Sequence, residues 1–422
     1  MTLRQIASLA VLAVLAGVFL AVIPGHRGWF DVGVYYGTVQ HWTHGGNIYD
    51  YQRPGTGYGF TYPPFAALCM LPMALVGWHT AIAIATTLNV LATGALLYWL
   101  VDPIARRQGW NRGFAFGLAA VAFAVLNPVR DTFSFGQINL LLMAMVFADC
   151  RRLSRGGRFA GVGIGLAAAV KLTPAVFIGY LVITRRYRAA LVAVGSALGA
   201  TLLGQAVAPG ASHFFWHQAL WDTSRVGNLG YISNQSLQGM LARLAPNSPS
   251  KAVWAAAVLL VLTVWAHRAR RADRCGDQWT GFALTGLASC LVSPITWVHH
   301  LVWALPALLA LADGGLKATQ PARRRLLLGG SAAVYVVLTS GLVWLWKGPP
   351  SGLGGFLGAN SYLLLTVALL VAVPVPAAVA RRRPVAGTAA GRPRTVVLER
   401  PLPLVSRELA RDLVSRGSRS PR

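Results

Sequence analysis

Acidic side chains are scarce in this chain of 422 residues. It has 12 Asp and Glu against 38 Lys and Arg, and charged residues make up only 12% of the sequence, while hydrophobic residues make up 55%. A soluble chain of this length is not so apolar, and a β-barrel would show short alternating strands in place of the long apolar runs seen here. The composition predicts an all-α, polytopic integral membrane helical bundle.

Several common chemistries leave no trace in the sequence. The four cysteines are scattered, without a CxxC pair or the spacing of metal ligands, so neither a zinc site nor a disulfide framework is indicated. A GxxxxGK[ST] motif, an HExxH motif and a GxSxG motif with a plausible triad are also missing. Nucleotide hydrolysis and zinc proteolysis therefore have no support.

Positive charge is abundant, with a formal net charge of +26. In a soluble protein this would suggest nucleic acid, but in a membrane protein Lys and Arg collect in short cytoplasmic loops, so we expect no nucleic-acid partner. The basic clusters predict about 10–12 transmembrane helices, 12 preferred, in a domain of residues 1–380, with both termini cytoplasmic and a large first periplasmic loop at 24–63. The composition of residues 381–422 predicts a basic, disordered cytoplasmic tail near the anionic inner leaflet.

Two segments do not fit a simple count of spans. Residues 65–101 are long enough for two spans, but the alternation of sides demands an odd number, so we expect one half to be short or not to cross. Residues 159–183 begin and end beside cytoplasmic arginines and are broken at Lys171–Pro174. We therefore predict two short helices that meet inside the protein.

Four carboxylates remain on the predicted outer side: Asp31, Asp50, Asp131 and Asp222. A general base for external chemistry would be one of them. Asp31 is best placed, because it follows the first apolar run closely and should lie at the membrane boundary, where a lipid-linked substrate presents its polar head. The alternative is an interfacial residue that caps a short helix, among aromatic membrane anchors.

Other polar groups gather on the same side. The first loop combines aromatic residues, amides and glycines, which suit sugar binding. His299 and His300 begin a span, and adjacent positions on a helix point about 100° apart, so a proton or phosphate role fits better than a shared metal. Lys171 stands inside an apolar segment, where a charge is costly. For Lys171, a phosphate partner and snorkelling to an interface remain equal alternatives; for the histidines, the alternative is a plain interfacial pair.

Seven short motifs, taken in this order, resemble the actinobacterial polyprenyl-phosphate-mannose-dependent mannosyltransferases of glycosyltransferase family 87. They are WFDVGVYYG, GNIYDY, FTYPPFA, NPVRDTFSFGQIN, AAVKLTP, SNQSLQG and SPITWVHH. The resemblance covers roughly residues 25–310 and leaves out the basic tail. It implies a GT-C fold with a periplasmic active site at the plasma membrane.

The resemblance also implies a reaction. Mannose would pass from a β-linked polyprenyl-phosphate donor to a phosphatidylinositol mannoside, lipomannan or lipoarabinomannan acceptor, forming an α-1,2 bond by inversion. Asp31 would be the base. The candidates for the donor phosphate are Lys171, His299, His300 and Arg225. The candidates for sugar or acceptor binding are Tyr35, Asp50, Tyr62, Gln137, Asn139, Asn234 and Gln235. No metal or other cofactor is assigned, because the lipid-linked donor is a substrate.

Two alternatives stay open. The first is an arabinofuranosyltransferase of the same family that uses decaprenyl-phosphate-arabinose. The second is a transporter of a lipid-linked sugar, since broken helices and scattered polar groups also suit transporters. The sequence shows no internal repeat and concentrates its polar groups on one side, which disfavours transport. It gives no indication of the oligomeric state.

Overall fold

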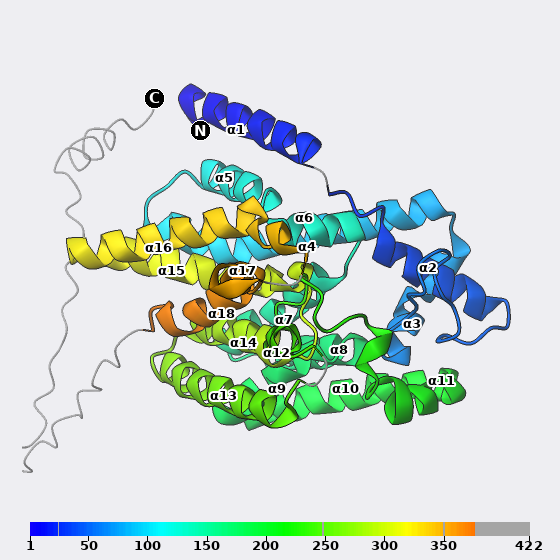
Figure 1. Ribbon diagram of the computed structural model, residues 1–422. Helices are drawn as coiled ribbons and strands as arrows, with labels where there is room; N and C mark the ends of the chain where they lie inside the picture. Colours follow the sequence, from blue (N-terminus) through cyan, green and yellow to red (C-terminus); the bar gives the residue numbers. More distant parts are fainter. Residues whose placement is uncertain (24, 247–248, 349–350, 376–422) are drawn as a thin grey trace, which may run out of the picture. The chain divides into compact units, whose positions relative to one another are not determined.

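A computed structural model describes residues 1–23, 25–246, 249–348 and 351–375 (Figure 1). Within these ranges the secondary structure is helical, and the one strand-like contact is an isolated bridge between Gln52 and Gly59. The all-α prediction is therefore confirmed. The predicted tail at 381–422 lies outside the described residues.

The helices follow one another closely along the chain. The α-helices of the first half are α1 (Leu3–Val22), α2 (Phe30–Thr43), α3 (Pro64–Met70), α4 (Trp78–Arg107), α5 (Arg112–Ala124), α6 (Asn127–Phe135), α7 (Asn139–Ser154), α8 (Val162–Val170), α9 (Val176–Ile183) and α10 (Tyr187–Val207). Those of the second half are α11 (Pro209–Phe214), α12 (Leu237–Leu244), α13 (Lys251–Arg274), α14 (Gln278–Val292), α15 (Leu305–Lys317), α16 (Pro321–Ser340), α17 (Gly352–Ala359) and α18 (Ser361–Ala372).

The number of membrane-length helices is smaller than the 10 to 12 spans predicted. Among the described residues, α1, α4, α10 and α13 are long and apolar enough to cross a membrane, and the count rises to six if the bent pairs α5–α6 and α17–α18 each form one span. The difference arises because several apolar runs fold as shorter or broken helices. The chain is nonetheless a polytopic helical membrane protein.

Both ambiguous segments contain the predicted short pieces. In the first, α3 and a 3₁₀ turn, η1 (Leu71–Leu75), precede the single long helix α4. In the second, α8 ends at Lys171, whose backbone is extended (φ −150°, ψ 127°), and a 3₁₀ turn, η2 (Thr173–Ala175), leads into α9. Pro174 cannot continue a helix by donating a backbone N–H, so the break falls where the sequence indicated.

The core is built around α14, which is buried along nearly its whole length. It packs against α13, α15, α9 and α18, and against the 3₁₀ helix η5 (Val298–Ala304). In Figure 1, α2, α3 and α11 gather at one end of the bundle, and α18 ends toward the other. By contrast, α1 has no buried residue, as expected for a helix whose apolar side chains face lipid.

Candidate functional site

A cavity of about 460 Å³ opens at the end of the bundle where α2 lies. Its walls come from segments far apart in the sequence: the start of α2, the chain before α3, the turn after α6, the break after α8, the loop before α12 and the start of η5. We call it the outer cavity. Its lining includes Asp31, Tyr35, Tyr62, Gln137, Lys171, His299 and His300. Seven of the predicted site residues thus share one cavity.

Asp31 occupies the first turn of α2, where the helix dipole favours a carboxylate. The chain enters α2 through Trp29, a non-glycine residue in the left-handed region (φ 53°). Arg53 holds this entry by donating hydrogen bonds of 3.4 Å to the carbonyls of Gly28 and Trp29. A left-handed backbone at a bulky residue is costly and persists only where the surroundings impose it, as at many active sites.

The Asp31 carboxyl is strongly desolvated. Burial raises its pKa to about 6, although a hydrogen bond from Gln137 and the nearby Lys171 and Arg53 cations act to lower it. Its Oδ2 atom is buried and has no hydrogen-bond partner in the described part of the chain. That oxygen is therefore left without a protein donor beside the outer cavity.

Lys171 lies at the centre of a polar network. Its Nζ is 2.9 Å from Oδ1 of Asn139, 2.9 Å from Nε2 of His300 and 3.4 Å from the hydroxyl of Tyr62. The residue is 9% exposed, and it also lies over the Tyr62 ring, 5.1 Å from the centroid. The Lys171 amino group is therefore held inside the protein and does not snorkel to a surface; a phosphate partner stays a prediction.

The two histidines differ in what they offer. The His300 Nδ1 accepts a hydrogen bond from the Trp297 backbone N–H at 3.2 Å, and its Nε2 meets Lys171. His299 packs its ring against Phe135, with the centroids 5.1 Å apart, and its Nε2 has no partner among the described residues. His299 thus has an unpartnered ring nitrogen beside the outer cavity, whereas the Nε2 of His300 is engaged by Lys171.

Hydroxyl and amide groups connect the two halves of the cavity. The hydroxyls of Tyr35 and Tyr62 are 3.0 Å apart, and Tyr62 donates to Oε1 of Gln137 at 3.1 Å. Gln137 in turn hydrogen-bonds Asp31, and its backbone carbonyl accepts from Asn89 at 3.0 Å. The turn that presents Gln137 depends on Gly136, which has φ +71° and where an added Cβ would lie 2.0 Å from the Val32 side chain.

Five predicted site residues do not line the outer cavity. Asn139 lies behind Lys171, where it also donates to the His299 carbonyl at 3.3 Å. Asp50 is exposed on the first loop. Arg225 donates to the Tyr49 carbonyl at 3.2 Å and stacks over Phe214.

Asn234 and Gln235 are fully buried, and their amides serve the backbone. Asn234 donates to the carbonyls of Leu229 and Pro294 and accepts from the Thr296 N–H. Gln235 donates to Ile232 and Ala359 and accepts from the Leu363 N–H. Each side chain has both its donor and its acceptor occupied, so it braces the backbone, and sugar binding by these two residues stays a prediction.

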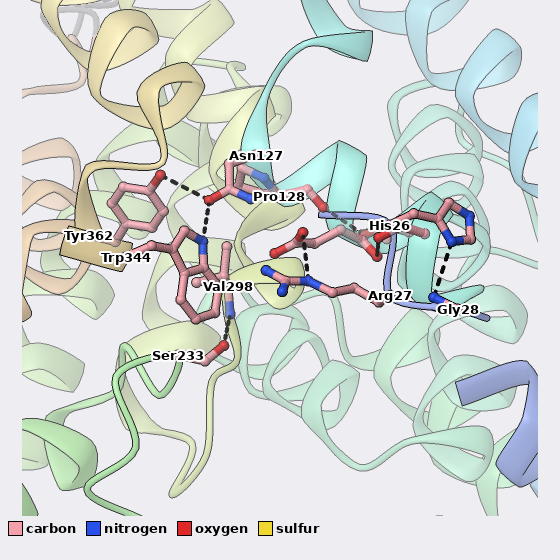
Figure 2. Close-up of polar contacts among 12 residues, drawn as sticks. His26, Arg27, Gly28, Asn127, Pro128, Ser233, Val298, Trp344 and Tyr362 are labelled. Atoms are coloured by element: carbon pink, nitrogen blue, oxygen red, sulfur yellow. Dashed lines mark hydrogen bonds and ion pairs between the residues drawn. The ribbon is translucent and has the colours of Figure 1, made fainter. Parts of the chain in front are cut away.

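Arg27 was not predicted, yet it lines the outer cavity. Its Nε lies 3.6 Å from Oδ1 of Asp131, and its guanidinium lies over the Trp344 ring, 4.9 Å from the centroid. Figure 2 shows Arg27 beside Trp344. The Trp344 indole N–H and the Tyr362 hydroxyl both donate hydrogen bonds to the side-chain oxygen of Asn127. The sequence signal that could have identified Arg27 as a site residue is its position in the outer loop, just before Asp31. Asp131 itself is buried and does not line the outer cavity.

In the ranges that the structure describes, no three or more His, Cys, Asp or Glu side chains are grouped so as to hold a metal ion. The cationic groups that line the outer cavity are Arg27 and Lys171.

The outer cavity thus brings a buried carboxylate, Asp31, together with a lysine–histidine pair, Lys171 and His300, at one end of a helical membrane bundle. Comparison with known proteins gives the family. The model of glycosyltransferase family 87 matches residues 60–294. The chain belongs to this family, as its motifs indicated.

Curated mycobacterial proteins are similar along most of the chain. A polyprenol-phosphate-mannose-dependent α-(1-2)-phosphatidylinositol mannoside mannosyltransferase of Mycobacterium tuberculosis (strain ATCC 25618 / H37Rv) is 34% identical, over 76% of this chain and 80% of that protein. The protein of the same description from Mycolicibacterium smegmatis is 35% identical, over 67% and 69%. An α-(1-2)-phosphatidylinositol pentamannoside mannosyltransferase of M. tuberculosis (strain CDC 1551 / Oshkosh) is 33% identical, over 80% and 77%. No solved structure gives a significant match.

Proposed function

We propose that this protein transfers mannose from polyprenyl-phosphate-mannose to a phosphatidylinositol mannoside, forming an α-1,2 linkage, at the periplasmic face of the plasma membrane. One observation carries the proposal: in a family 87 chain, the outer cavity combines a buried carboxylate, Asp31, with a lysine–histidine pair, Lys171 and His300. The relatives are named for this donor, acceptor and linkage.

The proposed chemistry needs one base. Asp31 takes the proton from an acceptor hydroxyl while that oxygen attacks the anomeric carbon of the donor. The bond between the anomeric carbon and the phosphate oxygen breaks, and the phosphate leaves with both bonding electrons. Attack opposite the leaving group inverts the β-linked donor to an α-mannoside. A phosphate leaving group carries its own charge and needs no second carboxylic acid, unlike the sugar leaving group in glycoside hydrolysis.

Lys171, with His300 behind it, stabilises the charge that grows on the departing oxygen, and the unpartnered Nε2 of His299 offers a further contact. Preorganised groups of this kind act strongly in a site that excludes water. Arg27 lies farther along the cavity wall, beside Trp344, and suits the acceptor, because an aromatic face and a guanidinium together suit a sugar bearing a phosphate.

The test is an assay of the purified full chain with polyprenyl-phosphate-mannose and phosphatidylinositol mannosides of different mannose number, followed by linkage analysis of the product. We expect an α-1,2-mannoside and the same rate after treatment with EDTA, because Lys171 supplies the positive charge at the phosphate. Turnover only with decaprenyl-phosphate-arabinose would assign the other donor. Movement of the intact donor across proteoliposomes without any transfer would overturn the proposal in favour of transport.

A further inference from the structure

A second cavity, of about 660 Å³, lies at the other end of the bundle. Helix α14 spans the distance between the two: Trp279 and Thr280 in its first turn line this second cavity, and Ser293 just past its end lines the outer cavity. Its 15 residues correspond to about 22 Å. We call this second space the inner cavity, because the positive-inside rule places its end of the bundle at the cytoplasm.

The inner cavity has apolar walls and a basic mouth. Its apolar lining includes Trp99, Leu100, Pro306, Leu309 and Pro374. Four cationic side chains line it as well: Arg107 from the end of α4, Arg271 from α13, Lys317 from the end of α15 and Arg323 from the start of α16. The helix ends that meet here thus combine an apolar recess with positive charge.

The two acidic side chains of the lining are already engaged. Asp313 pairs with Arg107 and, at 2.7 Å, with Lys317. Asp277 caps α14 by accepting from the Thr280 N–H at 3.0 Å and from its hydroxyl at 2.7 Å.

The positive charge that remains is not neutralised within the described residues. The side chains of Arg271 and Arg323 have neither an ion pair nor a hydrogen bond there, and both residues are exposed. The mouth therefore carries two cations that are free to bind an external anion.

We propose that the inner cavity binds an anionic phospholipid of the cytoplasmic leaflet. The phosphate of the headgroup lies between Arg271 and Arg323, and an acyl chain follows the wall formed by Trp99 and Leu309. Basic pockets between the cytoplasmic ends of transmembrane helices suit anionic headgroups. The inner cavity thus matches both parts of a phospholipid, the anionic headgroup and the apolar acyl chain. A soluble anion would leave the apolar wall uncovered.

The chain's own tail is a poorer occupant on charge. Residues 381–422 contain eleven arginines against Glu399, Glu408 and Asp412. Like charges repel, so binding of this arginine-rich segment to a mouth lined by four cations is unfavourable.

The test compares two double variants of the full chain in a neutral detergent. Arg271→Gln/Arg323→Gln removes the two unpaired cations of the mouth. Arg324→Gln/Arg325→Gln removes two exposed arginines of the same helical turn that do not line the cavity. Native mass spectrometry measures retention of phosphatidylglycerol, which has a net negative charge, and, as the control, of phosphatidylcholine, which is zwitterionic and has no net charge. The thermal midpoint in lipid-free detergent checks that both variants fold.

We expect the wild-type chain to retain phosphatidylglycerol in preference to phosphatidylcholine. The apparent affinity should fall about 10- to 30-fold in Arg271→Gln/Arg323→Gln, as expected for the loss of two interfacial cations, and should stay unchanged in Arg324→Gln/Arg325→Gln. Equal retention of both lipids, or equal losses in the two variants, would overturn the assignment. Displacement of the lipid by glycerol 3-phosphate at equal concentration would also overturn it and assign a soluble phosphate.

Discussion

Nζ of Lys171 lies 2.9 Å from Nε2 of His300. An ammonium has only donors, and an imidazolium carries hydrogen on both ring nitrogens, so the two cannot face each other fully protonated. The opposite ring nitrogen, Nδ1, already accepts a hydrogen bond from the Trp297 N–H. With Nδ1 accepting, a neutral ring carries its hydrogen on Nε2, so Nζ accepts that hydrogen as a neutral amine; an ammonium at Lys171 instead requires the hydrogen on Nδ1 and the loss of the Trp297 contact. The protonation of the two side chains is therefore coupled, and they respond to a phosphate anion as one unit.

The first prediction concerns this unit. Lys171→Met should weaken donor binding and lower kcat/KM at least about 30-fold, because truncating one member of a buried, hydrogen-bonded charged contact costs about 2–5 kcal/mol. His300→Ala should act in the same direction. The loss in the double variant should be clearly smaller than the sum of the single losses, since residues in one network are coupled. Steady-state kinetics and donor-binding titrations measure both; fully additive losses would show that the two side chains act separately.

The second prediction concerns Asp31. Asp31→Asn keeps the shape of the side chain but removes the base, so turnover should fall at least about 100-fold, the lower end for loss of general-base catalysis. Donor binding should be retained, because the phosphate partners are untouched. Asp131→Asn is the matched control: Asp131 is paired with Arg27 at 3.6 Å, so its loss should alter KM for the acceptor more than turnover. A base role for Asp131 would produce the reverse pattern.

The sequence indicated several residues that share the outer cavity, but not how they pack. Asp31, Lys171 and the histidines were singled out because a charge beside or within an apolar run is expensive and rarely accidental. For Asn234 and Gln235 the sequence did not reveal the backbone partners, because an amide that braces a backbone and one that binds a sugar look alike in sequence. Arg27 was missed because its importance depends on Trp344, which is distant in sequence.

The fold, like the site, was predictable in some parts and not in others. The break at Lys171–Pro174 was predictable, since an extended residue before Thr173 and Pro174 is a local property. The number of spans was not, because length and apolarity do not reveal which runs bend. The 73° bend between α5 and α6 comes just before Pro128, which lies in the first turn of α6. The angle of the bend is set by the packing of α6 against η5.

The third prediction is a pH dependence. Burial raises the pKa of Asp31 to about 6, and a base works only when deprotonated. The value of kcat/KM should therefore be constant above this pH and fall tenfold per pH unit below it, about two units higher than for an exposed aspartate with a pKa of about 3.9. Gln137 lowers the pKa through its hydrogen bond, so Gln137→Leu should move the acid limb to higher pH. A limb that stays in place in Gln137→Leu would argue against Asp31 as the titrating group.

The fourth prediction separates bracing from binding. Gln235 joins the loop before α12 to α17 and α18 through the Ala359 carbonyl and the Leu363 N–H. Gln235→Leu leaves these buried backbone groups unpaired, which costs about 1–3 kcal/mol each, so the thermal midpoint should drop. The KM values of the folded fraction should stay close to those of the wild-type chain. A large rise in KM without a change in the midpoint would return Gln235 to the sugar-binding set.

The last prediction concerns sidedness, on which the periplasmic site and the cytoplasmic lipid both depend. Thr56 lies on the first loop beside the outer cavity, and Ser154 lies at the end of α7 among basic residues; both are exposed. Cys69 is also exposed and would take up label itself, so it must first be replaced by Ser. In that background, Thr56→Cys should react with an impermeant maleimide in intact cells, and Ser154→Cys only after lysis. Neither residue belongs to the proposed catalytic set, so transfer activity can confirm that the labelled chains are native. Labelling of Ser154→Cys but not Thr56→Cys in intact cells would show that the topology is the reverse of the one proposed. Both sides would then be reversed together, because the arginine clusters and the outer cavity lie at opposite ends of α14.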